Sequence, residues 1–107
     1  VRRTPVATAL MFDALARVAD TTAVAPGTSI AWDFTDARPW RMTLEGGTAR
    51  AEQVDSPAGA DLILTCGFDD WVDVFAERAD PRVLMLRRRI RPKGDQRLLL
   101  RLGRVFG

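Results

Sequence analysis

The feature of this chain that most restricts its fold is a change of hydrophobic period at Ser29. Before it, residues 6–19 carry apolar side chains at the i, i+3, i+4, i+7 spacing of one helix face. These residues are Ala7, Leu10, Met11, Ala14, Leu15 and Val18. After Ser29, large apolar residues recur at every second position, which is the period of a strand with one buried face. The chain therefore has to pack a helix against a sheet.

Four strands are predicted between residues 30 and 66. Two of them each place three large apolar groups on one face, namely Ile30, Trp32 and Phe34, followed by Trp40, Met42 and Leu44. Gly46-Gly47 tolerates positive φ and suits a tight hairpin, so residues 48–54 should return as a weakly apolar third strand. The unbroken apolar run 62–66 predicts a fourth strand that is buried on both faces.

Three helices and a short strand are predicted in the rest of the chain. Asp69 is expected to cap a helix, and Asp80-Pro81 should end that helix and start a short one. Residues 88–93 form a short extended run, after which Asp95 should cap a final helix. The apolar stripe of that helix is Leu98, Leu99, Leu102, Val105 and Phe106. We expect one domain over residues 1–107.

Composition excludes most of the common catalytic side chains. The chain has no His and no Tyr, and Cys66 is its single Cys. Proton transfer and metal binding near neutral pH rely on such groups, so we expect no catalytic residues, no metal and no cofactor. Asp69, Asp70 and Asp73 are close together, but their place at a helix start favours capping over a metal site. Cys66 is expected to be a core residue.

One Cys and the lack of an apolar run of about 20 residues favour a cytoplasmic location. The first residue is Val1 and not Met. The chain is therefore also compatible with one domain of a longer protein.

Basic residues gather near the end of the chain. Residues 82–104 contain nine basic side chains and one acidic one, a net charge of +8, although the whole chain has only +2. Within this segment lie Arg87, Arg88, Arg89, Arg91 and Lys93. Three interpretations remain open, in decreasing order of preference: an edge strand whose charges deter further pairing, a dock for an anionic membrane, and a nucleic-acid patch, which lacks stacking aromatics.

The second half of the chain resembles the end of sterol-carrier-protein-2 (SCP-2) type domains. Its sequence is ADLILTCGFDDWVDVFAERADPRVLMLRRRIRPKGDQRLLLRLGRVF. In that family a strand of the form D-x-x-L is followed by a helix that begins with acidic residues, which match residues 61–66 and 69–78. A short helix and a strand ending in Gly-Asp come next and match residues 81–86 and 88–95. A leucine-rich helix ends the domain and matches residues 96–106. Upstream, residues 32–36 (WDFTD) are similar to the first strand of SCP-2 domains fused to alkylsulfatases. One departure is Arg87-Arg88-Arg89, where many members have a Gly.

The resemblance implies an α+β fold, with a mostly antiparallel five-stranded sheet and helices packed on one face. It also implies a hydrophobic tunnel between the layers that accepts an acyl chain, a sterol or another apolar molecule. The residues expected to line it are Ile30, Trp32, Phe34, Met42, Leu44, Leu62, Leu64, Trp71, Phe75, Leu84, Leu98, Leu102 and Phe106. The residues alone favour a final helix that closes a solid core, and the resemblance brings a lid over a tunnel to about the same rank.

We therefore expect a lipid-binding or lipid-carrying domain that is not an enzyme by itself. The main alternative is an accessory domain of a larger enzyme, which presents a hydrophobic substrate or mediates oligomer contacts. A basic nucleic-acid-binding module ranks last. The expected partners are an apolar small molecule or lipid, an anionic membrane surface, and a fused or partner enzyme domain.

Overall fold

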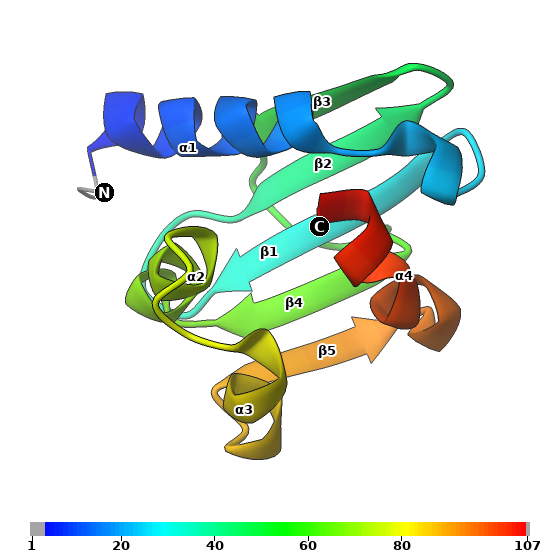
Figure 1. Cartoon of the computed structure of the whole chain (residues 1–107). Coiled ribbons are helices and arrows are strands. Elements are labelled where there is room, and N and C mark those ends of the chain that lie inside the picture. Colours follow the sequence, from blue (N-terminus) through cyan, green and yellow to red (C-terminus); the bar gives the residue numbers. More distant parts are fainter. Residues whose placement is uncertain (1–3, 107) are drawn as a thin grey trace.

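A computed structural model describes residues 4–106 and shows a five-stranded sheet with the helices on one of its faces (Figure 1). The predicted element order is confirmed, with one added 3₁₀ turn. The elements are α1 (Pro5–Val18), η1 (Thr21–Ala23), β1 (Thr28–Phe34), β2 (Trp40–Glu45), β3 (Thr48–Gln53), β4 (Leu62–Cys66), α2 (Phe68–Phe75), α3 (Pro81–Leu86), β5 (Ile90–Gly94) and α4 (Gln96–Phe106).

The sheet has the order β3-β2-β1-β4-β5. Three of its strand pairs are antiparallel, and β1 and β4 are parallel, so the predicted α+β, mostly antiparallel class is confirmed. Glu45 pairs with Thr48 across the predicted hairpin, and Gly47 has a φ of 94°. The turn therefore uses the conformational freedom that glycine supplies.

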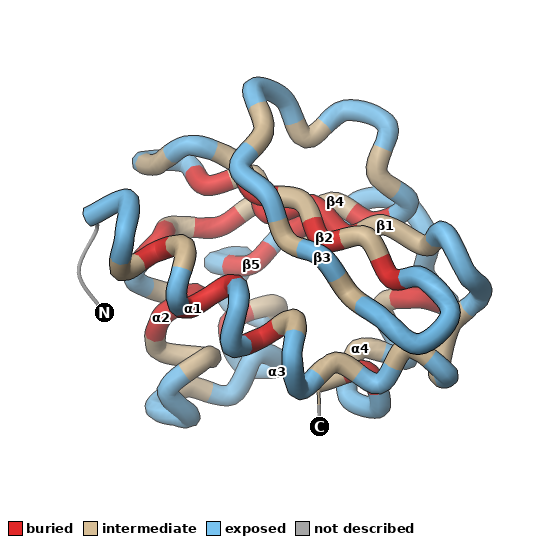
Figure 2. Tube along the Cα trace, turned by 90° about the horizontal axis from the view of Figure 1, so that it is seen from above, coloured by how far each residue is buried: buried red, intermediate tan, exposed pale blue. Residues whose placement is uncertain are grey.

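The connection from β3 to β4 crosses the face of the sheet that the helices leave open. It has to cross because β2 and β1 lie between β3 and β4. Arg41, which alternates with the buried Trp40 and Met42, donates from Nη2 to the carbonyl oxygen of Ala58 at 2.5 Å. Figure 2 shows this loop passing over the strands on the side away from the helices. Strand β4 is nevertheless fully buried on one face only, because Ile63 is half-buried, and the expectation of burial on both faces was wrong.

An aromatic cluster joins the sheet to the helices. Trp32 of β1 has no exposed surface, and its ring centroid lies 5.1 Å from Phe12 of α1, 5.2 Å from Trp71 of α2 and 6.4 Å from Phe106 of α4. Phe12 also stacks on Trp40 at 4.7 Å. The buried residues of Figure 2 accordingly lie between the sheet and its helices.

The buried face of α1 differs from the predicted stripe. Met11 and Leu15 are buried as expected, but Leu10 and Val18 are 64% and 65% exposed. Phe12, which lies outside the predicted stripe, has no exposed surface. Stacking of Phe12 on the sheet aromatics turns the helix so that a second apolar stripe faces solvent.

The N-terminus of α2 is also capped differently from the prediction. Gly67 is the N-cap, and Asp69 lies inside the first turn with Asp70. The amide of Phe68 donates instead to Asp36 Oδ1 at 2.9 Å, so a carboxylate from the β1–β2 turn serves this helix start. The predicted cap residues Asp80 and Asp95 are confirmed, because each accepts amide hydrogen bonds from the first turn of its helix.

We expect Gly94→Ala to destabilise the fold by at least about 2 kcal/mol. Gly94 has a φ of 115°, and a Cβ there would collide with the carbonyl oxygen of Asp61. Gly46→Ala is the matched control, because a Cβ at Gly46 meets nothing within 4 Å; we expect a change below about 0.5 kcal/mol. Urea unfolding measures both. Equal effects would show that the close approach at Gly94 is unimportant.

We expect Cys66 to be unreactive in the folded protein. Burial raises the pKa of its thiol to about 12, and the carboxylates of Asp70 and Asp36 add to the rise. Because the thiolate is the reactive form, an aromatic disulfide reagent at pH about 8 should modify the folded chain at least about 100-fold more slowly than the urea-unfolded chain. Similar rates in both states would contradict the burial of this strand end.

Candidate functional site

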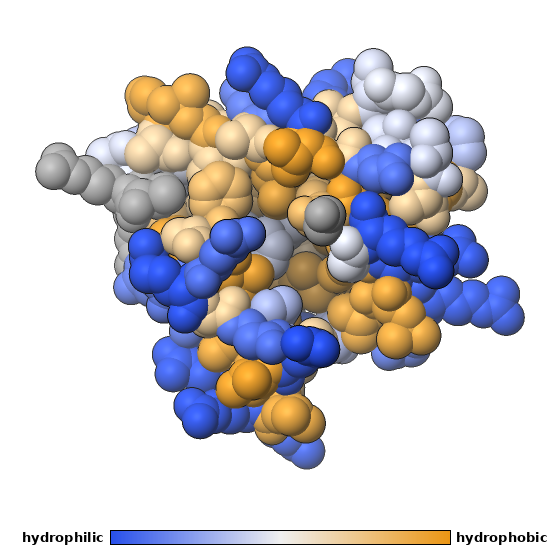
Figure 3. All heavy atoms as spheres, in the orientation of Figure 1, coloured by the Kyte–Doolittle hydropathy of each residue, from blue (hydrophilic) through white to orange (hydrophobic). Residues whose placement is uncertain are grey.

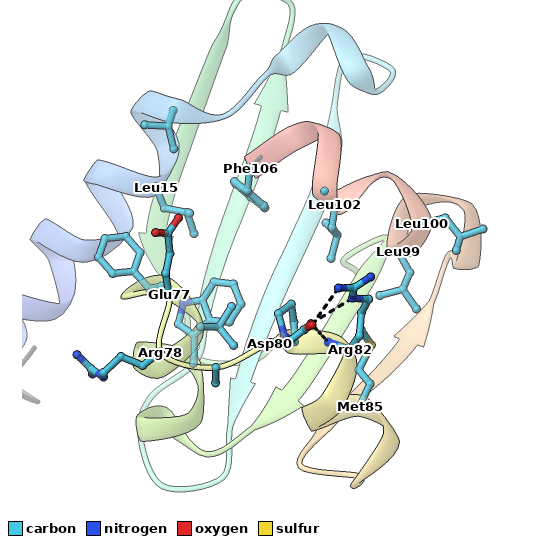
Figure 4. Close-up of a pocket in the computed structure, with 17 residues that line it drawn as sticks. Leu15, Glu77, Arg78, Asp80, Arg82, Met85, Leu99, Leu100, Leu102 and Phe106 are labelled. Atoms are coloured by element: carbon cyan, nitrogen blue, oxygen red, sulfur yellow. Dashed lines mark hydrogen bonds and ion pairs between the residues drawn. The ribbon is translucent and has the colours of Figure 1, made fainter.

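A pocket of about 1110 Å³ lies among the four helices. Figure 4 shows its residues projecting from the C-terminal part of α1, from α2 and the following turn, and from α3 and α4. The lining residues are Leu15, Val18, Trp71, Val74, Phe75, Glu77, Arg78, Ala79, Asp80, Pro81, Arg82, Met85, Leu99, Leu100, Leu102, Gly103 and Phe106. Most of these side chains are apolar, so the space suits an apolar ligand.

The charged residues of the pocket lie in the segment between α2 and the start of α3. Asp80 is the N-cap of α3, and its carboxylate accepts from Arg82 Nε at 3.2 Å and from Arg82 Nη2 at 3.0 Å (Figure 4). These hydrogen bonds lower the pKa of Asp80. Arg78 forms an ion pair with Asp73 at 3.0 Å. Asp80, Arg82 and Arg78 are therefore paired locally, whereas Glu77 brings a further carboxylate to the same wall.

Four of the thirteen residues predicted to line a tunnel do line this pocket. They are Trp71, Phe75, Leu102 and Phe106. The other nine lie in the packed core, each at most 8% exposed: Ile30, Trp32, Phe34, Met42, Leu44, Leu62, Leu64, Leu84 and Leu98. Trp71 and Phe106 both pack on Trp32. They form the boundary between pocket and core, and a ligand role for the nine core residues stays a prediction.

Sequence reasoning missed several residues of the pocket wall. Leu15 and Leu99 belonged to predicted helix stripes, so their apolar character was visible, but their place in a pocket was not. Met85 and Leu100 gave no signal of their own. They line the pocket only because α3 and α4 approach each other in front of the sheet.

The basic residues proposed as a surface dock lie outside this pocket. Strand β5 is an edge strand, and Arg91 and Lys93 alternate along it with the buried Ile90, so they face away from the helix layer. Arg89 is engaged in an ion pair with Asp70 at 2.8 Å. Their role in docking stays a prediction.

The departure at Arg87-Arg88-Arg89 has a visible consequence. Arg88 has a φ of 59°, a left-handed conformation that glycine adopts more readily. The turn before β5 is thus made here by an Arg in a conformation that favours glycine.

Within residues 4–106, no group of three or more His, Cys, Asp or Glu side chains is placed to hold a metal ion. None of the described helices is long and apolar enough to span a bilayer. The titratable side chains of the pocket are Glu77, Arg78, Asp80 and Arg82. This arrangement offers binding surface and no recognisable nucleophile with its general base.

Comparison with solved structures identifies the fold. The chain is similar to the inverting sec-alkylsulfatase Pisa1 from Pseudomonas sp., with 23% identity and a TM-score of 0.73 over 94% of this chain. It spans only 16% of the length of that enzyme. It is also similar to sterol carrier protein 2 like 2 from Aedes aegypti, with 17% identity and a TM-score of 0.63 over 94% of this chain and 96% of that one. A palmitated form of that mosquito protein matches with 16% identity and a TM-score of 0.57 over 88% of both chains.

At these identities the structural matches establish the fold alone. A comparison with curated proteins found no match. The profile of the family described as "Alkyl sulfatase C-terminal" matches residues 4–107, nearly the whole sequence. The chain therefore belongs to the alkyl sulfatase C-terminal family and has the fold of sterol carrier protein 2 domains.

Proposed function

We propose that this chain binds an apolar ligand, such as an acyl chain, in the pocket among its helices and performs no chemistry by itself. The observation that carries the proposal is the pocket of about 1110 Å³ with its mostly apolar wall. The mosquito relative solved in a palmitated form supports an acyl chain as the ligand class. We also propose that residues 1–107 act as one domain, and a cytoplasmic location stays our prediction from the sequence.

The energy of such binding comes from removing ligand surface from water. Each buried methylene group contributes about 0.8 kcal/mol, so a chain of several methylenes binds without any ionic contact. Met85 adds adaptability, because its unbranched side chain can repack around different ligands. A ligand would reach Trp32 and the core residues below only if Trp71 and Phe106 moved aside.

We expect Leu99→Gln to weaken uptake of a fluorescent fatty acid by about tenfold, because it replaces apolar pocket wall with an amide. Leu99 is half-buried and lines the pocket. Leu86→Gln is the matched control, since Leu86 is 85% exposed and is absent from the pocket wall. Fluorescence titration without membranes measures both. No uptake by the parent chain, or equal losses in the two variants, would refute binding at this pocket.

A second candidate function is that of an accessory domain in a larger hydrolase. Membership of the alkyl sulfatase C-terminal family favours it, as does the match to only 16% of an alkylsulfatase chain. In this role the pocket would hold the hydrocarbon part of a substrate while another domain cleaves it. Nothing in the described residues adds support for the nucleic-acid alternative.

The accessory role makes a separate prediction for a parent protein whose reading frame encodes a hydrolase domain. We expect Leu99→Gln to raise KM for a long-chain alkyl sulfate by about tenfold and to leave kcat unchanged, because the domain contributes only binding. A short-chain alkyl sulfate should show no change in KM. Equal effects on both substrates would contradict this role.

A further inference from the structure

We propose that the face around the pocket mouth docks on an anionic lipid surface, so that a ligand passes between that surface and the pocket without crossing water. The transfer step rests on the function proposed above. The docking itself rests on separate observations, namely where exposed apolar side chains gather and which charges flank them.

The exposed large apolar side chains of the described residues all lie on helices. We call them the apolar rim: Val6, Leu10, Val18, Val83, Leu86 and Leu100, with exposures from 41% to 85%. None of them lies on a strand. Figure 3, seen from the helix side, shows separate hydrophobic groups over α1, α3 and α4 around a central hollow. The rim therefore lies on the helix side of the molecule, which also holds the pocket, and avoids the opposite face of the sheet.

The rim is continuous with the pocket itself. Val18 and Leu100 belong both to the rim and to the pocket wall. Val6, Leu10 and Val18 form an exposed stripe on α1 at multiples of four residues, because Phe12 directs the other face of this helix into the core. Single exposed apolar residues are ordinary on protein surfaces, but a set gathered on the one side that holds an apolar pocket indicates a contact surface.

The charges beside the rim define the chemistry of the partner. Arg97, Arg101 and Arg104 form an exposed stripe along α4 next to Leu100. Helix α4 carries these three arginines and no acidic residue. Arginine side chains can keep their stems on an apolar surface while their guanidinium groups reach lipid phosphates. Apolar groups flanked by arginines therefore fit the interface of an anionic lipid surface.

This surface differs from the basic dock predicted around residues 87–93. Arg91 and Lys93 face away from the helix layer, so they could not approach the same plane as the rim. Two double variants with the same change of charge separate the two surfaces: Arg101→Glu with Arg104→Glu on α4, and Arg91→Glu with Lys93→Glu on β5.

The experiment is flotation of the purified chain with vesicles of phosphatidylcholine, with and without phosphatidylglycerol, at low and high salt. We expect binding that requires phosphatidylglycerol and weakens with salt. The α4 double variant should lose at least about tenfold in partitioning, and the β5 double variant should bind as the parent chain does. Leu10→Gln combined with Leu86→Gln should also weaken binding. Circular dichroism confirms that each variant is folded.

Three results would each overturn the proposal. They are no vesicle binding by the parent chain, equal binding with and without phosphatidylglycerol, and loss of binding in the β5 double variant. A change of oligomeric state in the rim variants, without vesicle binding by the parent, would show that the face contacts protein instead. Fatty acid uptake, measured without vesicles, reports separately on the proposed function. Docking without uptake, or uptake without docking, would therefore identify which of the two inferences fails.

Discussion

Packing around Trp32 is the constraint on which the rest of this structure depends. Its indole lies on the central strand β1, has no exposed surface and contacts aromatic rings from α1, α2 and α4. These contacts decide which face of α1 is buried and how far α2 and α4 stand from the sheet. Because a core is packed at nearly crystalline density, the pocket does not extend to Trp32 itself. The space for a ligand lies instead on the outer side of Trp71 and Phe106.

The pocket exists because the helices meet around these aromatic rings without closing the layer in front of them. The wall of α4 contributes Leu99, Leu102 and Phe106, and the short helix α3 contributes Met85. With charged side chains at one wall and apolar side chains elsewhere, such a site suits a ligand that is held by burial of apolar surface. This property suits both a free carrier and the C-terminal part of an alkylsulfatase-like enzyme. The two roles differ only in whether the ligand is released or presented to another domain.

Much of the fold was predictable because local patterns determine its elements. The alternation of Trp40, Met42 and Leu44, followed by Gly46-Gly47, correctly identified β2 and its hairpin. The one cap that was predicted wrongly depends on a distant residue, because Asp36 serves the start of α2 from a turn between two strands. The buried face of α1 was also misjudged, since its apolar residues form two overlapping stripes. Only contact with Trp40 and Trp32 selects the stripe that includes Phe12.

The sequence by itself determined the helices and strands, the two-residue hairpin and the lack of histidine chemistry, because each follows from residue identity and spacing. Tertiary structure alone decided the parallel pairing of β1 with β4 and the crossing of the loop behind the sheet. It also separated the apolar residues into core, pocket wall and exposed rim. Leu98, Leu99 and Leu100 are chemically identical neighbours, yet Leu98 is buried in the core, Leu99 is half-buried in the pocket wall, and Leu100 lines the pocket while 84% exposed. Hydrophobic spacing specifies a helix face, but only the neighbouring elements determine what that face meets.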